Sequence, residues 1–307
     1  MNSISKRLLC AAAVAALSVY GFSDDQGKDD DVRPSGRKNL PSNHPDLGEA
    51  LGFARTGGAS TNGINYHGGP VMYSGVTAYL IYYGTSFQST TQTIMNDLSA
   101  HIGGSGYFNI NTTYYDSSNR HVPNSVTFGG STVISGYPNG KSLSDATIQS
   151  IIGGVLTAGT FPRSANAIYF LLTDKTVTAS SGFCTQYCGW HTHATMGGVD
   201  IKYAFIGSPD RCSASCSALQ GSPNNNTEAD AMASIWSHEL EEAATDPDLN
   251  AWYDRSGYEN ADKCAWTFGT TFTTSNGAKA NMTLGGRSYL IQQNWLNARG
   301  GKCALSY

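Results

Sequence analysis

Six cysteines in the C-terminal half of the chain place the strongest limit on what it can fold into. They are Cys184, Cys188, Cys212, Cys216, Cys264 and Cys303. An even number of cysteines in an exported chain indicates a disulfide framework. The sequence does not fix the pairing, and the spacing favours two local pairs, each across three residues, with one long cross-link at the C-terminus. A zinc site made of cysteines is the alternative, but it suits neither the Cys-x-x-x-Cys spacing nor an oxidising compartment.

The N-terminus has the pattern of a secretory signal peptide. Two basic residues precede a short apolar run over residues 8–17, and small residues follow it. The run is about half the length of the roughly 20 residues that a membrane-spanning helix needs. We therefore expect residues 1–22 to be a signal peptide that carries Cys10 away when it is cleaved. The mature protein is predicted to be secreted, with no membrane attachment.

The remaining chain divides into a polar leader and a folded part. Residues 23–65 contain few large apolar side chains and many aspartates and prolines, so we expect a flexible leader or pro-segment. Residues 66–307 have the composition of a folded protein without an internal linker, which predicts one domain. The formal net charge is −4 and no cluster of lysine and arginine occurs, so no nucleic-acid partner is expected.

Apolar patterns within residues 66–307 predict a mixture of strands and helices. A further hairpin is expected around Gly285 and Gly286, and a loop is expected to hold His191 and His193. The predicted strands cover residues 76–83, 107–115, 126–134, 167–172 and 201–206, and the predicted helices cover residues 89–102, 142–156 and 227–244.

The last of these helices carries a candidate metal motif. His238 and Glu242 are four residues apart, so their side chains project from one face of the helix and can hold one metal ion. Glu239 lies beside that face, where a zincin keeps the general base that deprotonates the attacking water. A carboxylate in place of the usual second histidine suits zinc, although it also suits Ca²⁺ or Mn²⁺. In the alternative interpretation, carboxylates hold His238 for structural reasons only.

A hydrolytic zinc site needs a third protein ligand, and Glu259 is the first candidate. Its position resembles the thermolysin-like plan, in which a glutamate from a later element completes the site and an aspartate one turn further on orients the histidine. Asp248 follows His238 at the offset that a metzincin uses for its third ligand. The candidates that stay open beside Glu259 are Asp246, Asp248, Asp262 and His191.

Several segments together resemble the EXORDIUM-like, or phosphate-induced protein, family. They are residues 68–71, 188–191, 238–242, 246–247, 250–253, 262–264 and 286–295, and the resemblance spans about residues 66–307. Membership implies an extracellular or cell-wall protein, linked in plants to growth and brassinosteroid response, without an assigned biochemical activity. The plant members often have Asn-Pro where this chain has Asp246 and Pro247.

These observations lead to a prediction of an α+β, zincin-like mixed sheet with packed helices in a single disulfide-cross-linked domain. The leading function is that of a zinc-dependent, peptidase-like hydrolase acting on a peptide or a cell-wall polymer. His238, Glu242 and Glu259 would bind the zinc ion, and Glu239 would be the catalytic base. The alternative is a non-catalytic extracellular or cell-wall protein acting in growth signalling or carbohydrate binding, in which Trp252 or Trp266 would stack on sugar rings.

Overall fold

A computed structural model describes residues 63–255, 257–298 and 300–307 of the protein. The expected signal peptide, residues 1–22, and nearly all of the expected leader, residues 23–65, lie outside this described part. Among the described residues, no helix combines the length and the apolar composition needed to span a bilayer.

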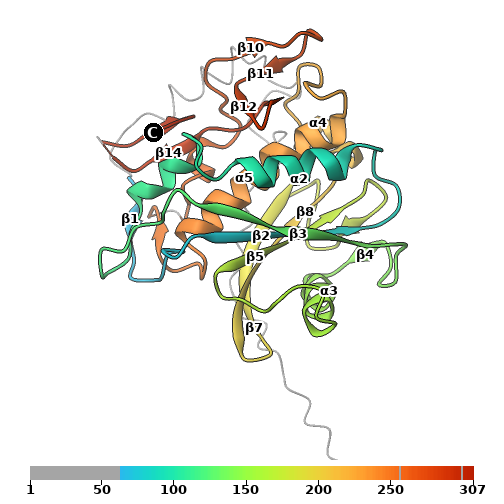
Figure 1. Ribbon diagram of the computed structural model, residues 1–307, viewed down its shortest axis with the longest axis horizontal. Helices are drawn as coiled ribbons and strands as arrows, with labels where there is room; N and C mark the ends of the chain where they lie inside the picture. Colours follow the sequence, from blue (N-terminus) through green and yellow to red (C-terminus); the bar gives the residue numbers. More distant parts are fainter. Residues whose placement is uncertain (1–62, 256, 299) are drawn as a thin grey trace, which may run out of the picture.

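A five-stranded mixed sheet lies at the centre of the fold (Figure 1). Its order is β3-β2-β5-β8-β7, in which β3, β2, β5 and β8 run parallel and the edge strand β7 runs antiparallel to β8. Almost every residue of β2 and β5 is buried, as expected for parallel strands whose two faces are covered. The bounds are β2 Val76–Tyr83, β3 Val126–Ile134, β5 Ala167–Thr173, β7 Gly189–Met196 and β8 Val199–Ile206.

Helices cover both faces of this sheet. Figure 1 shows α2 (Thr91–His101) and α5 (Thr227–Thr245) on one side and α3 (Asp145–Thr157) on the other. The predicted helices are confirmed with small changes in their ends. The Ser144 hydroxyl, for example, caps α3 by accepting a hydrogen bond from the Thr147 N–H at 3.1 Å. The shorter helices are η1 Phe108–Thr113, η2 Pro209–Arg211, α4 Ser213–Cys216 and η3 Asp262–Cys264.

Short pairs of strands, one of them parallel and the others antiparallel, complete the described fold. The predicted hairpin at Gly285 and Gly286 is confirmed, and the C-terminal pairs gather on the side of the sheet that carries α5 (Figure 1). The pairs are β1 (Asn65–Tyr66) with β9 (Trp252–Tyr253), β4 (Ser142–Leu143) with β6 (Thr178–Ala179), β10 (Phe272–Thr273) with β11 (Lys279–Ala280), β12 (Met282–Leu284) with β13 (Arg287–Tyr289), and β14 (Asn294–Leu296) with β15 (Lys302–Ala304).

Three disulfides cross-link the fold, but two of them differ from the favoured local pairing. The bonds join Cys184 to Cys212, Cys188 to Cys216, and Cys264 to Cys303. The two Cys-x-x-x-Cys segments lie side by side, so each cysteine pairs across to the other segment at the same sequence separation of 28. The expected cross-link at the C-terminus is confirmed.

Two predicted elements are wrong. Residues 107–115 do not form a strand, because the chain turns into the 3₁₀ helix η1, with the Ile110 N–H donating to the Tyr107 carbonyl at 3.0 Å. His191 and His193 do not lie in a loop, because β7 pairs with β8 around a turn at Gly197 and Gly198. Both glycines of that turn have the positive φ angles that tight hairpins require, 61° and 79°.

Candidate metal centre

Helix α5 brings the predicted motif into the interior of the protein. It begins after Asn226, whose side chain accepts a hydrogen bond from the Ala229 N–H at 2.8 Å, so Asn226 is the cap. The helix ends at Thr245, before Pro247. Every residue from 228 to 245 is buried, the charged ones included. Buried carboxylates are costly unless other groups balance their charge, so their partners decide what this helix does.

His238 and Glu242 converge on one face of α5, as the spacing predicts. The Nε2 atom of His238 lies 3.0 Å from Oε1 of Glu242, and both side chains are fully buried. Asp262, at the start of η3, joins them: its Oδ1 lies 3.8 Å from His238 Nε2. The Asp262 N–H also donates to Glu242 Oε1 at 2.8 Å, which fixes the orientation of the Glu242 carboxylate.

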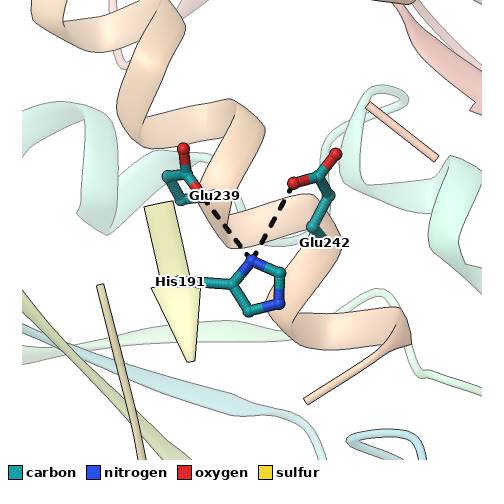
Figure 2. Close-up of side chains that lie close together, drawn as sticks. All are labelled: His191, Glu239 and Glu242. Atoms are coloured by element: carbon teal, nitrogen blue, oxygen red, sulfur yellow. Dashed lines mark ion pairs between the residues drawn. The ribbon is translucent and has the colours of Figure 1, made fainter. Parts of the chain in front are cut away.

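A second imidazole, that of His191, enters the same region from β7. Figure 2 shows Glu239 and Glu242 both directed toward His191 Nδ1, at 3.6 Å from Glu239 Oε2 and 3.8 Å from Glu242 Oε2. The opposite ring nitrogen, Nε2, faces Glu259 Oε2 at 3.7 Å and the carbonyl oxygen of Asp246 at 3.4 Å. His191 is therefore held between carboxylates on two sides.

The predicted site residues separate into two neighbouring groups that share Glu242. Ligand atoms of His191, Glu239 and Glu242 lie within 4.8 Å of one another, and so do those of His238, Glu242 and Asp262. Imidazole nitrogens with carboxylate oxygens are a donor set that zinc accepts. Asp262 is thus the carboxylate placed with His238 and Glu242, whereas Glu259 contacts His191.

The other aspartates considered as third ligands have different contacts. The Asp246 Oδ1 atom accepts hydrogen bonds from the backbone N–H groups of two residues in the turn after α5, each at 2.6 Å. Asp248 lies in a separate cluster with His193 and Asp200, where Lys202 Nζ is 2.8 Å from Asp248 Oδ1. Because the lysine ammonium already balances those carboxylates, this cluster does not resemble a metal site.

Glu241, between the two motif glutamates, faces a different environment. Its carboxylate accepts a hydrogen bond from the Asn294 amide, and its backbone carbonyl accepts one from the Asn260 amide at 3.2 Å. Burial raises the pKa of Glu241 well above its ordinary value, the hydrogen bonds from Asn294 and Asn111 oppose this, and the negative charge of Glu242 adds to it. Burial therefore disfavours the charged form of Glu241, whose carboxylate and carbonyl belong to a buried amide network.

The contact between β7 and α5 depends on a residue without a side chain. A Cβ atom added to Gly189 would lie 2.8 Å from Glu239 Oε1 and 2.8 Å from a methyl carbon of Ile235. Gly189 follows Cys188, which the disulfide to Cys216 fixes in place. Because Gly189 has no side chain, β7 can approach α5 closely enough for Glu239 to lie beside His191.

The sequence contained a signal for the place of His191. From Trp190 to Met196 the apolar residues, Trp190, Ala194 and Met196, all fall at every second position, whereas His191 and His193 fall at the positions between. Gly197 and Gly198 follow before the next predicted strand. Alternation closed by Gly-Gly is typical of a β-hairpin. That interpretation puts His191 and His193 on one face of a strand next to the predicted strand at 201–206.

The fold and the cluster define a disulfide-cross-linked α+β protein with a candidate metal centre on helix α5. The chain belongs to the family described as the phosphate-induced protein 1 conserved region, whose model matches residues 64–299. The predicted family resemblance is therefore confirmed. Every residue of the two ligand groups lies within the matched range.

Relatives from plants support this assignment. The chain is 31% identical to Protein EXORDIUM-like 3 of Arabidopsis thaliana over 270 residues, which cover 76% of this chain and 80% of the relative. It is 30% identical to Protein EXORDIUM-like 5 of the same plant, over 76% of this chain and 75% of the relative. Identity to Protein PHOSPHATE-INDUCED 1 of Nicotiana tabacum is 25%, over 62% of this chain and 67% of the relative. No solved structure matches the chain significantly.

Proposed function

We propose that this protein is a secreted zinc-dependent hydrolase, peptidase-like in its chemistry, with His238 and Glu242 as zinc ligands. The observation that carries the proposal is the convergence of these two side chains, 3.0 Å apart on consecutive turns of a buried helix. Within the described part of the chain, their ion-pair contacts are with imidazoles and carboxylates, which are themselves zinc ligands, and not with lysine or arginine. Asp262 is the third ligand that the distances favour.

The residues around the motif fit the roles that such a reaction needs. Bound zinc supplies a Lewis acid that lowers the pKa of water toward neutrality. Glu239 is the proposed base that takes the proton of the attacking water, because its carboxylate reaches the same cluster, 3.6 Å from His191 Nδ1. Glu259 would hold His191 in position through its contact with Nε2.

The fold supports a zincin-like arrangement as part of the same proposal. The motif helix α5 packs against β7 and β8, so the sheet edge forms one wall of the cluster. Secretion is also proposed, and it is supported by three disulfides, which persist in oxidising compartments.

A non-catalytic metalloprotein is the second candidate, and the burial of the cluster favours it. His191, Glu239 and Glu242 have no exposed surface, and metal sites closed to solvent are typically structural. A carbohydrate platform made of Trp252 or Trp266 has less support. Trp252 lies in the hydrophobic core, and Trp266 is partly buried against it.

Metal analysis and turnover together test the hydrolase proposal. We expect purified mature protein to retain zinc through gel filtration and to cleave members of a broad peptide library. Glu239→Gln should keep zinc at the His238 ligands and lose at least about 100-fold in turnover, the usual contribution of a general base. Zinc retained with no cleavage by the wild type would favour the non-catalytic metalloprotein. Zinc absent from the wild type would contradict both candidates.

A further inference from the structure

The two carboxylate oxygens of Glu242 face two different imidazoles. Oε1 lies 3.0 Å from His238 Nε2, and Oε2 lies 3.8 Å from His191 Nδ1. Oε1 also accepts the Asp262 N–H, whereas Oε2 is buried and accepts no hydrogen bond from the described residues. A buried carboxylate oxygen without a hydrogen bond calls for a partner such as an ion. Here that oxygen points toward a second potential ligand.

We propose that Glu242 bridges two divalent cations, so that the centre is dinuclear. This inference rests on the proposed metal function and extends it. One cation would be bound by His238, Asp262 and Glu242 Oε1, and the second by His191, Glu242 Oε2 and Glu239 Oε2, the Glu239 oxygen that faces His191. Glu239 Oε1 is then the oxygen that serves as the proposed base. The three ligand atoms of each subsite lie within 4.8 Å of one another. Paired cations about 3.5–4 Å apart are a recurring arrangement in hydrolases.

Glu259 supports the assignment of His191 as a ligand. A histidine that binds a metal through one ring nitrogen usually directs the other ring N–H at a carboxylate or a carbonyl. His191 Nε2 faces Glu259 Oε2 at 3.7 Å and the Asp246 carbonyl oxygen at 3.4 Å. In the proposed centre Nε2 carries the ring proton and Nδ1, the nitrogen that faces Glu239 and Glu242, is the metal ligand.

The charge of the cluster also favours two cations. Four carboxylates, those of Glu239, Glu242, Glu259 and Asp262, surround two imidazoles in the interior. In a metal-bound centre the imidazoles would be neutral and the carboxylates ionised, so these six side chains would together carry four negative charges. One divalent cation balances half of that charge, and two balance all of it. Buried charge is tolerated where ions of opposite sign lie next to it.

Metal stoichiometry tests this inference separately from the proposed function. Mature protein is stripped with a chelator, dialysed against excess Zn²⁺, passed through gel filtration and analysed for zinc per protein. We expect about two equivalents for the wild type, about one for Glu239→Gln and for Asp262→Asn, and far below one for Glu242→Ala. Circular dichroism checks that each variant is folded. Asp248→Asn, which alters a carboxylate outside the cluster, is the control and should keep both equivalents.

A second readout does not depend on stoichiometry. Protein loaded with Mn²⁺ should give the electron paramagnetic resonance spectrum of a coupled pair of ions, and Glu239→Gln should convert it into that of an isolated ion. One zinc equivalent in the wild type, unchanged by Glu239→Gln, with a single-ion spectrum, would overturn the dinuclear centre and leave the proposed function standing. No zinc in the wild type would overturn both.

Discussion

Gly189 shows how strongly a single residue can control the centre. A methyl group at this position would meet Glu239 Oε1 and Ile235 at 2.8 Å and the Phe205 carbonyl oxygen at 3.0 Å. Because α5 and β7 are both packed in the core, neither element can move away without cost. We expect Gly189→Ala to lower the free energy of unfolding by about 1–3 kcal/mol and to weaken zinc binding by displacing Glu239. Urea unfolding and zinc titration measure the two effects.

Gly154→Ala is the matched control for this change. Gly154 lies within α3, and a Cβ atom there meets nothing within 4 Å. Alanine should therefore stabilise the helix by up to about 1 kcal/mol and leave zinc binding unchanged. A Gly189→Ala protein that behaves like Gly154→Ala would show that the close approach of β7 to α5 is not needed.

The residues of the centre differ in how far they can be predicted from the sequence. His238 and Glu242 could be paired in advance, because a helix fixes the geometry of residues four apart. Glu259 and Asp262 were candidates, but the 3₁₀ turn at η3 decides that Asp262 faces His238 while Glu259 faces His191. No local pattern specifies such a long-range choice.

Among the secondary-structure elements, the ends of the parallel strands depend on Asp174. This buried residue follows β5, and its carboxylate accepts hydrogen bonds from the Thr85 and Ser86 N–H groups after β2, at 2.9 and 2.7 Å. It also accepts the Tyr137 hydroxyl hydrogen at 2.7 Å and two hydrogen bonds from Thr176. Asp174 thus joins the loops that follow β2, β3 and β5.

We expect Asp174→Asn to destabilise the protein in a pH-dependent way. Burial raises the pKa of Asp174, but the hydrogen bonds from Thr176, Tyr137 and Ser86 outweigh it, so the folded-state pKa lies below the ordinary 3.8. The stabilisation is therefore present above pH 3.8 and is lost as the pH falls through the folded-state pKa. Asp174→Asn should cost about 2–3 kcal/mol at pH 7, and the difference from the wild type should shrink in acid.

Urea unfolding of both proteins between neutral and acidic pH, with a chelator present throughout, measures this difference. Asp97→Asn is the control, because Asp97 forms a partly exposed ion pair with Arg287 at 2.7 Å, and its loss should cost at most about 1 kcal/mol. An Asp174→Asn difference that stays constant with pH would contradict the assigned role.

Strand prediction succeeded where the local pattern and the final environment agree. The predicted bounds of β2 and β3 match the structure, because dense β-branched and aromatic runs suit a sheet. Residues 107–115 have a similar composition, yet Phe108, Ile110 and Tyr114 are buried by the turns of η1 against α5 and β14. Composition alone does not separate a short strand from a helical turn that buries the same side chains.

For the molecule as a whole, the candidate metal centre joins parts of the chain that are far apart in sequence. His191 comes from the sheet edge, His238 and Glu242 come from α5, and Asp262 comes from η3, next to the disulfide of Cys264. The unfolded chain does not hold these ligands together. Any metal bound by them must therefore stabilise the folded state relative to the unfolded one.

Thermal unfolding of the intact protein should reveal this coupling between metal binding and folding. At zinc concentrations 100 times the dissociation constant, one site adds about 2.7 kcal/mol, which corresponds to a rise in Tm of about 5–10 °C for a domain of this size. Glu242→Ala should abolish the rise, because Glu242 contributes to both ligand groups. Magnesium at the same concentration should have little effect, since it prefers six oxygen ligands and keeps its water. An equal zinc-dependent rise in Glu242→Ala would place the stabilising metal elsewhere, because a ligand can raise Tm only through the folded site that it occupies.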